Sequence, residues 1–341
     1  MSAQRIFVGG TGRSGTTILL RLLGRHRRVH PLSLETRFIV DPDGLSDLAR
    51  NLTEDYSPVR SREALYRFER MMRQMAEPGR DPYRGYDMAA LCGREFYFRR
   101  LEQLLAELAD FEYSGRDLST VQAEEPRLVK WARSLDAIQR RLRKSGRVLP
   151  PSETPRRRFR HGRYFGDCAQ LAAVLAAYVD DLFRTAAALH GKGIWCEKTP
   201  HNLSHLRFIR ELFADAPFIH ILRDPRAVAR SLMKQPWAPD TANDCSRFVR
   251  GIYDAWFDYR ARNELPAGYY LEVRLETLTA QPTQTLAAIA QFLGLENDFE
   301  TLPEIRAEHE ADWRQGLSAN DISTIESSLT PYAQRLGYGS A

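Results

Sequence analysis

Short apolar runs alternate along the chain with longer stretches whose apolar residues recur at helical spacing. The runs are typical of buried strands, and the longer stretches are typical of helices with one buried face. The predicted strands cover residues 5–9, 193–197, 218–222 and 268–273. The predicted helices cover residues 16–28, 94–111, 167–191, 243–263 and 281–294, and two more begin at about 202 and 225. This alternation predicts an α/β fold with a mostly parallel sheet flanked by helices.

Residues 49–166 interrupt the alternation. Up to about residue 150 they are strongly charged and predicted to be mostly helical, with 94–111 as the clearest amphipathic segment. Parallel sheets of this class bind their ligands beyond the carboxyl ends of the strands. We therefore expect a single domain over residues 1–341, in which 49–166 form a helical insertion that caps those ends.

The last part of the insertion, residues 150–166, is rich in proline and arginine and is predicted to be an exposed loop. Five arginines and one histidine lie within residues 156–163. Two interpretations stay open for this basic segment. It is either a solvated loop or a lid that draws in an anionic ligand.

The turn after the first strand, GGTGRSGTT at residues 9–17, has the composition of a phosphate-binding loop. It fits two templates incompletely. One is the dinucleotide-binding G-x-G-x-x-G, and the other is G-x-x-x-x-G-K-[ST], in which Thr16 stands in place of the lysine. Backbone N–H groups and the helix dipole favour an anion at such a turn. The loop side chains that could also hold it are those of Thr11, Arg13, Ser14, Thr16 and Thr17.

Two interpretations of this loop involve an ordinary nucleotide. In a dinucleotide-binding oxidoreductase, Glu35 would be the ribose-binding acid, but it should then end a second strand, and residues 28–35 contain Pro31 in their middle. In a nucleotide kinase or NTPase, a lysine would hold the β- and γ-phosphates beside Mg²⁺. Here that lysine is absent.

A third interpretation is a phosphosulfate loop, which needs no metal. It requires a site for a second phosphate and a cation at the bridging oxygen, where negative charge grows as the S–O bond breaks. Arg223, at a predicted strand end, and Ser231, about two helical turns later, could grip one phosphate from two sides. Lys198, just past another strand end, is the candidate cation.

Composition narrows the class of protein. The chain has 341 residues, 43% of them hydrophobic, and a net charge of +5, which suits an anionic ligand but is too mild to predict a nucleic-acid partner. Its four cysteines are far apart in sequence, so we expect neither a zinc site nor a disulfide framework. We also expect no signal peptide and no membrane span, and hence a cytoplasmic protein.

Several segments, in this order, resemble the PAPS-dependent sulfotransferases, particularly the bacterial members of that family. The segments are FVGGTGRSGTTILLRLL, WCEKTP, ILRDPRAVARS, YYLEVRLETL with QPTQTLAAIAQFLGL, and ADWRQGLSANDISTIESSLTPYAQRLGY. The family transfers a sulfuryl group from 3′-phosphoadenosine-5′-phosphosulfate (PAPS) to a hydroxyl or amine and releases 3′-phosphoadenosine-5′-phosphate (PAP). The resemblance covers roughly the first 45 residues and most of 190–341.

The resemblance also implies roles for particular residues. The 5′-phosphosulfate loop corresponds to Thr11, Gly12, Arg13, Ser14, Gly15, Thr16 and Thr17. Arg223 and Ser231 correspond to the 3′-phosphate pair, and Lys198 to the lysine that tyrosylprotein sulfotransferases use on the leaving group. Glu35, in LETR, resembles the catalytic base of that branch, with His30 as the alternative base. Arg314 lies where relatives close a loop over PAPS.

One departure from the family concerns the adenine side of the site. Relatives often read V-x-Y-E-D-L near the last strand, with the tyrosine close to adenine, whereas this chain has Leu275 in VRLETL. An adenine contact is then lost or supplied by another residue.

The resemblance predicts direct in-line transfer without a metal. Glu35 would take the acceptor proton, while Lys198 and Arg13 would offset charge on the leaving phosphate. The acceptor is expected to be a glycan, a peptide or another small molecule, and an anionic one if the basic segment is a lid. A kinase, an NAD(P) oxidoreductase and a non-catalytic PAPS-binding relative stay open as alternatives, and the sequence leaves the oligomeric state open.

Overall fold

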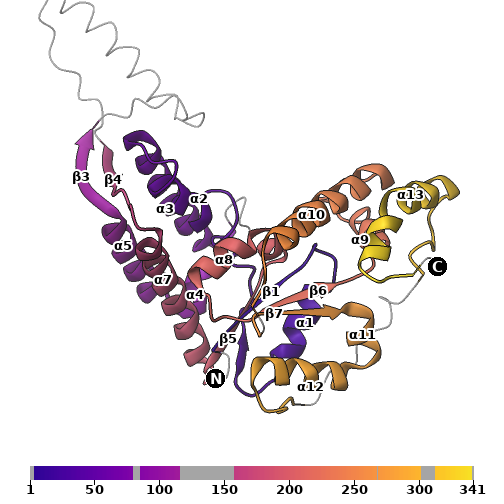
Figure 1. Ribbon diagram of the computed structural model, residues 1–341. Coiled ribbons are helices and arrows are strands. Elements are labelled where there is room, and N and C mark those ends of the chain that lie inside the picture. Colours follow the sequence, from indigo (N-terminus) through magenta and orange to yellow (C-terminus); the bar gives the residue numbers. More distant parts are fainter. Residues whose placement is uncertain (1–3, 80–84, 116–156, 267, 301–311, 340–341) are drawn as a thin grey trace, which may run out of the picture.

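The computed structural model describes residues 4–79, 85–115, 157–266, 268–300 and 312–339. Its strands are β1 (Arg5–Gly9), β2 (Val29–Pro31), β3 (Ala109–Gly115), β4 (Arg157–Gly162), β5 (Ile194–Lys198), β6 (Phe218–Leu222) and β7 (Tyr270–Arg274). Five of them form one sheet in the order β2-β5-β1-β6-β7, and every neighbouring pair in it is parallel. Helices lie on both sides of this sheet (Figure 1), so the predicted α/β class is confirmed.

The inner strands β1, β5 and β6 are buried along nearly their whole length because both faces of the sheet are covered. On one face, Ile6 and Val8 pack with α1 (Thr16–Leu23), α11 (Leu275–Ala280) and α12 (Pro282–Leu293). On the other face, Phe7 and Trp195 belong to a second apolar cluster, and their rings meet edge to face with centroids 5.2 Å apart. The helices on that face are α7 (Cys168–Leu189), α8 (Leu206–Leu212), α9 (Pro225–Leu232), α10 (Ala242–Arg262) and α13 (Ala319–Arg335).

The strand order tests the dinucleotide interpretation of the glycine loop. Doubly wound dinucleotide-binding sheets place the second strand beside the first. Here β1 lies between β5 and β6, and β2 lies at the edge of the sheet, beyond β5. The dinucleotide interpretation was therefore wrong.

Two expectations near the amino end were also wrong. The first helix was predicted to reach residue 28, but α1 ends at Leu23, and Gly24 lies so close to Pro31 that an added Cβ would stand 2.5 Å from its ring. The segment around Pro31 was expected to be a poor strand, yet it contains β2. Proline is tolerated there because it is the last residue of an edge strand, where no ladder hydrogen bond requires its nitrogen.

Two predicted helix starts were right. Asp167 caps α7 by accepting a hydrogen bond from the Ala169 N–H at 2.9 Å. Asp224 caps α9 in the same way, accepting from the Arg226 N–H at 2.9 Å, and Pro225 is the first residue of that helix. These caps fix where the chain turns after β4 and after β6.

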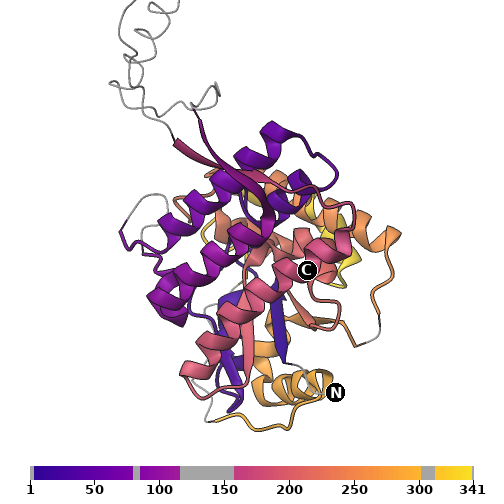
Figure 2. The same cartoon turned by 90° about the vertical axis from the view of Figure 1, so that its left-hand side faces the viewer.

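The described part of the insertion contains both helices and strands. Its helices are α2 (Leu45–Leu52), which begins just before it, α3 (Pro58–Met75), α4 (Met88–Cys92) and α5 (Arg94–Leu108). β3 and β4 pair antiparallel as a separate two-stranded sheet, so the expectation of a helical insertion is only partly right. Figures 1 and 2 show this small sheet at the end of the molecule opposite α12.

Candidate functional site

The glycine loop connects β1 to α1 at the carboxyl edge of the sheet, and its backbone is left-handed at three positions. The φ angles are 74° at Gly12, 54° at Arg13 and 96° at Gly15. Gly15 also lies against Leu275, where an added Cβ would stand 2.6 Å from Cδ1. The glycine pattern therefore reflects both a turn of positive φ and a close approach to the start of α11.

The amino end of α1 is open to an anion. Gly15 is the N-cap and provides no side-chain hydrogen bond, so the first N–H groups of the helix lack a cap from that residue. Within the described residues, the fully buried Ser14 Oγ also has no hydrogen-bond partner. Uncapped donors at a helix start are the arrangement that binds phosphate and sulfate groups.

Arg13, Arg223 and Ser231 come together beside this loop, where Arg13 contacts both of the residues that the sequence proposed as a phosphate-binding pair. The Arg13 Nε donates to Ser231 Oγ at 3.1 Å, and Arg223 Nη1 donates to the carbonyl of Arg13 at 3.0 Å. Arg223 is buried, at 8% exposed. Burial lowers the pKa of Arg223, and repulsion from Arg13 and Arg230 adds to this shift, while attraction to Glu276 and Asp224 opposes it. Such a concentration of positive charge favours a multiply charged anion.

A small pocket lies against these residues. We call it the loop pocket; it measures about 130 Å³ and is lined by Arg13, Gly15, Thr16, Thr17, Ile18, Arg223 and Leu275. Leu275, the residue expected in place of the relatives' adenine-side tyrosine, is a wall of this pocket rather than a residue remote from it. The position therefore offers an apolar surface to a ligand, without a ring to stack on.

Glu35 and Lys198 form a direct ion pair. Lys198 Nζ donates to Glu35 Oε1 at 2.6 Å, although the two residues are 163 positions apart. Lys198 ends β5 and pairs in register with Val8 of β1, two residues before Gly10. The segment after Lys198 also touches the loop, because the Gly10 N–H donates to the Pro200 carbonyl at 3.1 Å. The candidate base and the candidate cation therefore lie together, next to the glycine loop.

Two predicted residues lie elsewhere or are engaged in other contacts. His30 stacks on His190 with ring centroids 4.4 Å apart, and its strand partner is Trp195, three residues before Lys198 on β5. This places His30 away from the carboxyl edge, so the alternative base is disfavoured. Arg314 pairs with Glu326 at 2.6 Å and does not line the loop pocket, and its contact with phosphate stays a prediction.

Sequence reasoning missed Glu197 and Arg230. Glu197 is fully buried beside Lys198, and burial raises its pKa. An acid at the end of the otherwise apolar run GIWCE was the signal that could have found it. Arg230 directly precedes Ser231, and its effect on Arg223 depends on a packing that the sequence does not specify.

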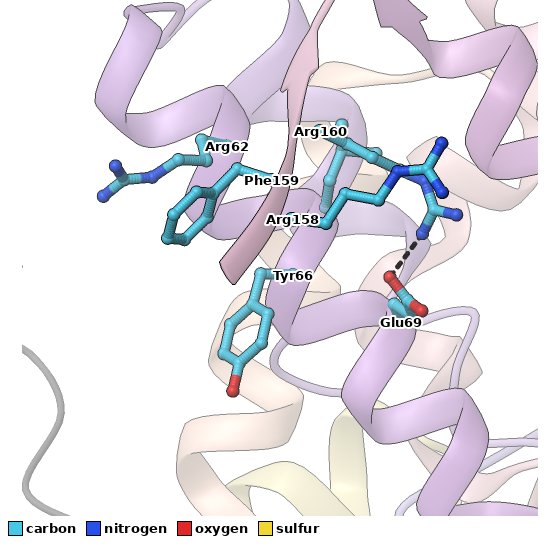
Figure 3. Close-up of a pocket in the computed structure, with 7 residues that line it drawn as sticks. Arg62, Tyr66, Glu69, Arg158, Phe159 and Arg160 are labelled. Carbon is cyan, nitrogen blue, oxygen red and sulfur yellow. Dashed lines mark hydrogen bonds and ion pairs between the residues drawn. The ribbon is translucent and has the colours of Figure 1, made fainter. Parts of the chain in front are cut away.

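The basic segment is not an exposed loop where the structure describes it. Arg157–Gly162 form β4, while Arg156 lies outside the described residues. Arg160 pairs with Glu69 and Glu102, each at 2.6 Å, and with Glu112 at 2.9 Å. Figure 3 shows Arg160 reaching toward Glu69 beside a pocket of about 180 Å³. Because Arg158 also pairs with Glu112 and Arg62 with Glu63, carboxylates balance the arginines of this pocket.

Comparison with known proteins identifies the family to which the chain belongs. A model of the sulfotransferase family matches residues 5–300, which include the glycine loop, Glu35, Lys198 and the Arg223–Ser231 pair. The chain belongs to the sulfotransferase family. Within that family, it is 33% identical over 103 residues to a Caenorhabditis elegans protein named "Putative protein-tyrosine sulfotransferase". Those residues are 29% of this chain and 39% of that protein.

Solved structures of other sulfotransferases resemble the chain over most of its length. The sulfotransferase domain of the Synechococcus PCC 7002 olefin synthase is 17% identical, with a TM-score of 0.45 over 96% of this chain and 94% of that one. The sulfotransferase domain from the curacin biosynthetic pathway is 14% identical, with a TM-score of 0.44 over 100% and 99% of the two chains. Among the described residues, no helix is both long and apolar enough to span a membrane.

Proposed function

We propose that this sulfotransferase uses PAPS as its donor and transfers the sulfuryl group directly to an acceptor hydroxyl or amine. The observation that carries the proposal is the Glu35–Lys198 pair, 2.6 Å apart, beside an anion-binding loop. A carboxylate can accept a proton and an ammonium can stabilise a leaving oxygen, so the pair contains both groups that the transfer requires.

The residues beside the loop fit a donor with two separate phosphate positions. The open start of α1 and the buried Ser14 hydroxyl suit the 5′-phosphosulfate. Arg223 and Ser231, which both contact Arg13 and have Arg230 nearby, suit the 3′-phosphate. Neither ATP nor NAD carries a 3′-phosphate, so the Arg223–Ser231 pair favours PAPS over both. In this donor the sulfuryl group is already activated by its bond to phosphate.

Different residues of the chain then have different roles in an in-line displacement. Glu35 takes the proton of the acceptor hydroxyl while the acceptor oxygen forms its bond to sulfur. The bond from sulfur to the 5′-phosphate oxygen breaks, and PAP leaves with the bonding electrons. Lys198 and Arg13 offset the negative charge that grows on that oxygen. An ammonium has three N–H donors, so Lys198 can hold Glu35 and the leaving oxygen together.

A tyrosyl hydroxyl of a peptide is the acceptor to test first. The partial likeness to the C. elegans protein supports this choice, and so does the position of Glu35 in LETR. The insertion is proposed to form the acceptor side of the site. Glycans and phenols are the next acceptors to test.

Ligand-dependent thermal stabilisation tests the donor assignment. A ligand that binds only the folded chain raises its melting temperature. We expect PAP to raise it far more than ATP or NAD at equal concentration, and EDTA to leave the PAP effect unchanged. Stabilisation by ATP with Mg²⁺ but not by PAP would reject the donor and favour a kinase.

A further inference from the structure

Glu197 is a buried carboxylate that the mechanism above does not use. Its side chain is fully buried. Burying a carboxylate is costly unless several donors surround it. Thr199 Oγ1 donates to it at 2.7 Å, Thr36 Oγ1 at 2.9 Å and Asn202 Nδ2 at 2.5 Å. A group surrounded so completely serves to hold these donors in place.

The donors of Glu197 lie next to the two reacting side chains in the sequence. Thr36 follows Glu35, and Thr199 follows Lys198. The structure therefore contains two side-chain contacts between the same two segments: Glu35 with Lys198, and Thr36 with Glu197. These contacts begin beyond the point where β2 and β5 stop pairing, since their register ends at Pro31 and Cys196.

The third donor links this arrangement to the strand that leads into the glycine loop. Asn202 Nδ2 donates both to Glu197 Oε2 and to the Val8 carbonyl of β1, at 3.2 Å. Glu197 thus connects the segment of Glu35, the end of β5 and the end of β1. Movement of any one of them would change the distance between Glu35, Lys198 and the loop.

We propose that Glu197 is a positioning residue that sets the Glu35–Lys198 pair in the geometry needed for transfer. This inference rests on the proposed function for its kinetic consequences, but the positioning itself can be measured without turnover. Glu197 does not touch the reacting atoms; it acts through Thr36 and Thr199.

The decisive variant is Glu197→Gln, which keeps the size of the side chain. A glutamine oxygen can still accept from the two threonine hydroxyls, but its NH2 group then faces the NH2 group of Asn202. We expect kcat to fall by about 10 to 100-fold, since small misplacements of reacting groups have effects of that order. The KM for PAPS and the stabilisation by PAP should change little, because the phosphate-binding residues are untouched.

A double variant separates positioning from general damage. If Glu197 acts through Glu35, Glu197→Gln should have no further effect on kcat in a Glu35→Gln background. Asp180→Asn is the matched control. Asp180 accepts from Arg5 of β1 at 2.9 Å and from Trp195 of β5 at 2.9 Å, at the other end of the same strands. We expect this variant to be less stable without a selective fall in kcat.

A measurement independent of activity is the acetylation rate of Lys198 by acetic anhydride, followed by peptide mass spectrometry. Lys198 is 6% exposed and paired, so it should react slowly. The rate should rise in Glu197→Gln and in Glu35→Gln, and stay unchanged in Asp180→Asn. Thr36→Val, which removes one hydroxyl that donates to Glu197, should raise the rate as well and decides the matter if Glu197→Gln does not fold.

These outcomes distinguish the two proposals. An unchanged Lys198 rate in both Glu197→Gln and Thr36→Val overturns the positioning role, whatever the activity. Losses of kcat that multiply in the Glu35→Gln background overturn the part of this role that acts through Glu35. A raised Lys198 rate in a protein that transfers no sulfuryl group would support the positioning and reject the proposed function.

Discussion

Arg223 is the residue on which the choice of donor depends. Its guanidinium is buried, and its pKa is lowered by burial and by the neighbouring arginines, so a bound dianion would relieve an unfavourable environment. Arg223→Met should weaken the binding of PAP by about 10 to 150-fold, which corresponds to the loss of one hydrogen-bonded charge pair. Binding of adenosine 5′-phosphate, which lacks the 3′-phosphate, should hardly change in calorimetric titrations.

The control for this variant is Arg207→Met. Arg207 lies on α8 and is 77% exposed at its side chain, where it pairs with Glu211. Arg207→Met should have the same affinity as the wild type for both nucleotides. If Arg223→Met weakened the binding of both nucleotides equally, Arg223 would not be the residue that binds the 3′-phosphate.

The sequence was most informative about charged residues that lie within recognisable motifs. Glu35 and Lys198 are predicted from separate motifs, and the structure brings them into contact. Glu197 is missed because a carboxylate inside an apolar run has no visible partners in the sequence. Thr36 and Asn202, which satisfy it, become its neighbours only when the sheet has formed.

At the scale of elements, the start of α1 is the part most sensitive to a single methyl group. Gly15→Ala would combine a φ of 96° with a Cβ placed 2.6 Å from Leu275. We expect the free energy of unfolding to fall by about 1–3 kcal/mol and stabilisation by PAP to disappear. Denaturant unfolding and thermal shifts with PAP measure the two effects.

Gly191→Ala separates the backbone strain from the steric contact. Gly191, after α7, has a φ of 66° but no atoms within 4 Å of an added Cβ. The Gly191→Ala variant should be moderately destabilised and should still be stabilised by PAP. If Gly15→Ala also responds fully to PAP, the loop does not bind the nucleotide in the way proposed.

The contact between β2 and α7 gives a pH dependence. Burial, with His190 and Lys192 nearby, lowers the pKa of His30 to about 4 from 6.5. Between these values the unfolded chain takes up a proton at His30 and the folded chain does not, so stability falls as the pH drops from 6.5 to 4.

The melting temperature should therefore fall less steeply over this range in His30→Gln than in the wild type. Identical slopes in the two proteins would show that His30 does not contribute.

Element boundaries depended on contacts that the sequence hides. The periodicity of 16–28 continues past Leu23, but Gly24 against Pro31 ends the helix and allows β2 to form. The strand β4 was missed because its arginines suggested a solvated loop. In the structure, the charges of Arg158 and Arg160 are neutralised by glutamates on β3, α3 and α5.

At the scale of the whole molecule, Arg160 is the main polar link within the described part of the insertion, since it joins β4 to α3, α5 and β3. Arg160→Met leaves three carboxylates near one another without their shared partner. We expect a loss of about 2 kcal/mol in the free energy of unfolding. Arg158→Met, at a side chain 77% exposed, should lose about 0.5 kcal/mol or less.

Both variants should retain their response to PAP, because neither residue lines the loop pocket. A loss of PAP binding in Arg160→Met with unchanged stability would mean that the network supports the donor site. Denaturant titrations with and without PAP distinguish these results.

The overall architecture was largely predictable, since strands alternating with helices specify a parallel sheet and its carboxyl edge as the site. The strand order was not, because the sequence pattern does not say that β5 and β6 flank β1. The β3–β4 pair was also not predictable, since its strands are joined by a long stretch of chain. The single-domain boundary, the acceptor-binding role of the insertion and the cytoplasmic location stay predictions.

The central claim is that Glu35 and Lys198 serve transfer from PAPS. The most direct measurement is transfer of label from [³⁵S]PAPS to tyrosyl peptides, glycans and phenols, by the wild type and by Glu35→Gln in the presence of EDTA. We predict transfer to at least one acceptor class by the wild type and its near-complete loss in Glu35→Gln, which should still be stabilised by PAP. Equal transfer by the two proteins, or no transfer by the wild type to any of these acceptors, would contradict the account.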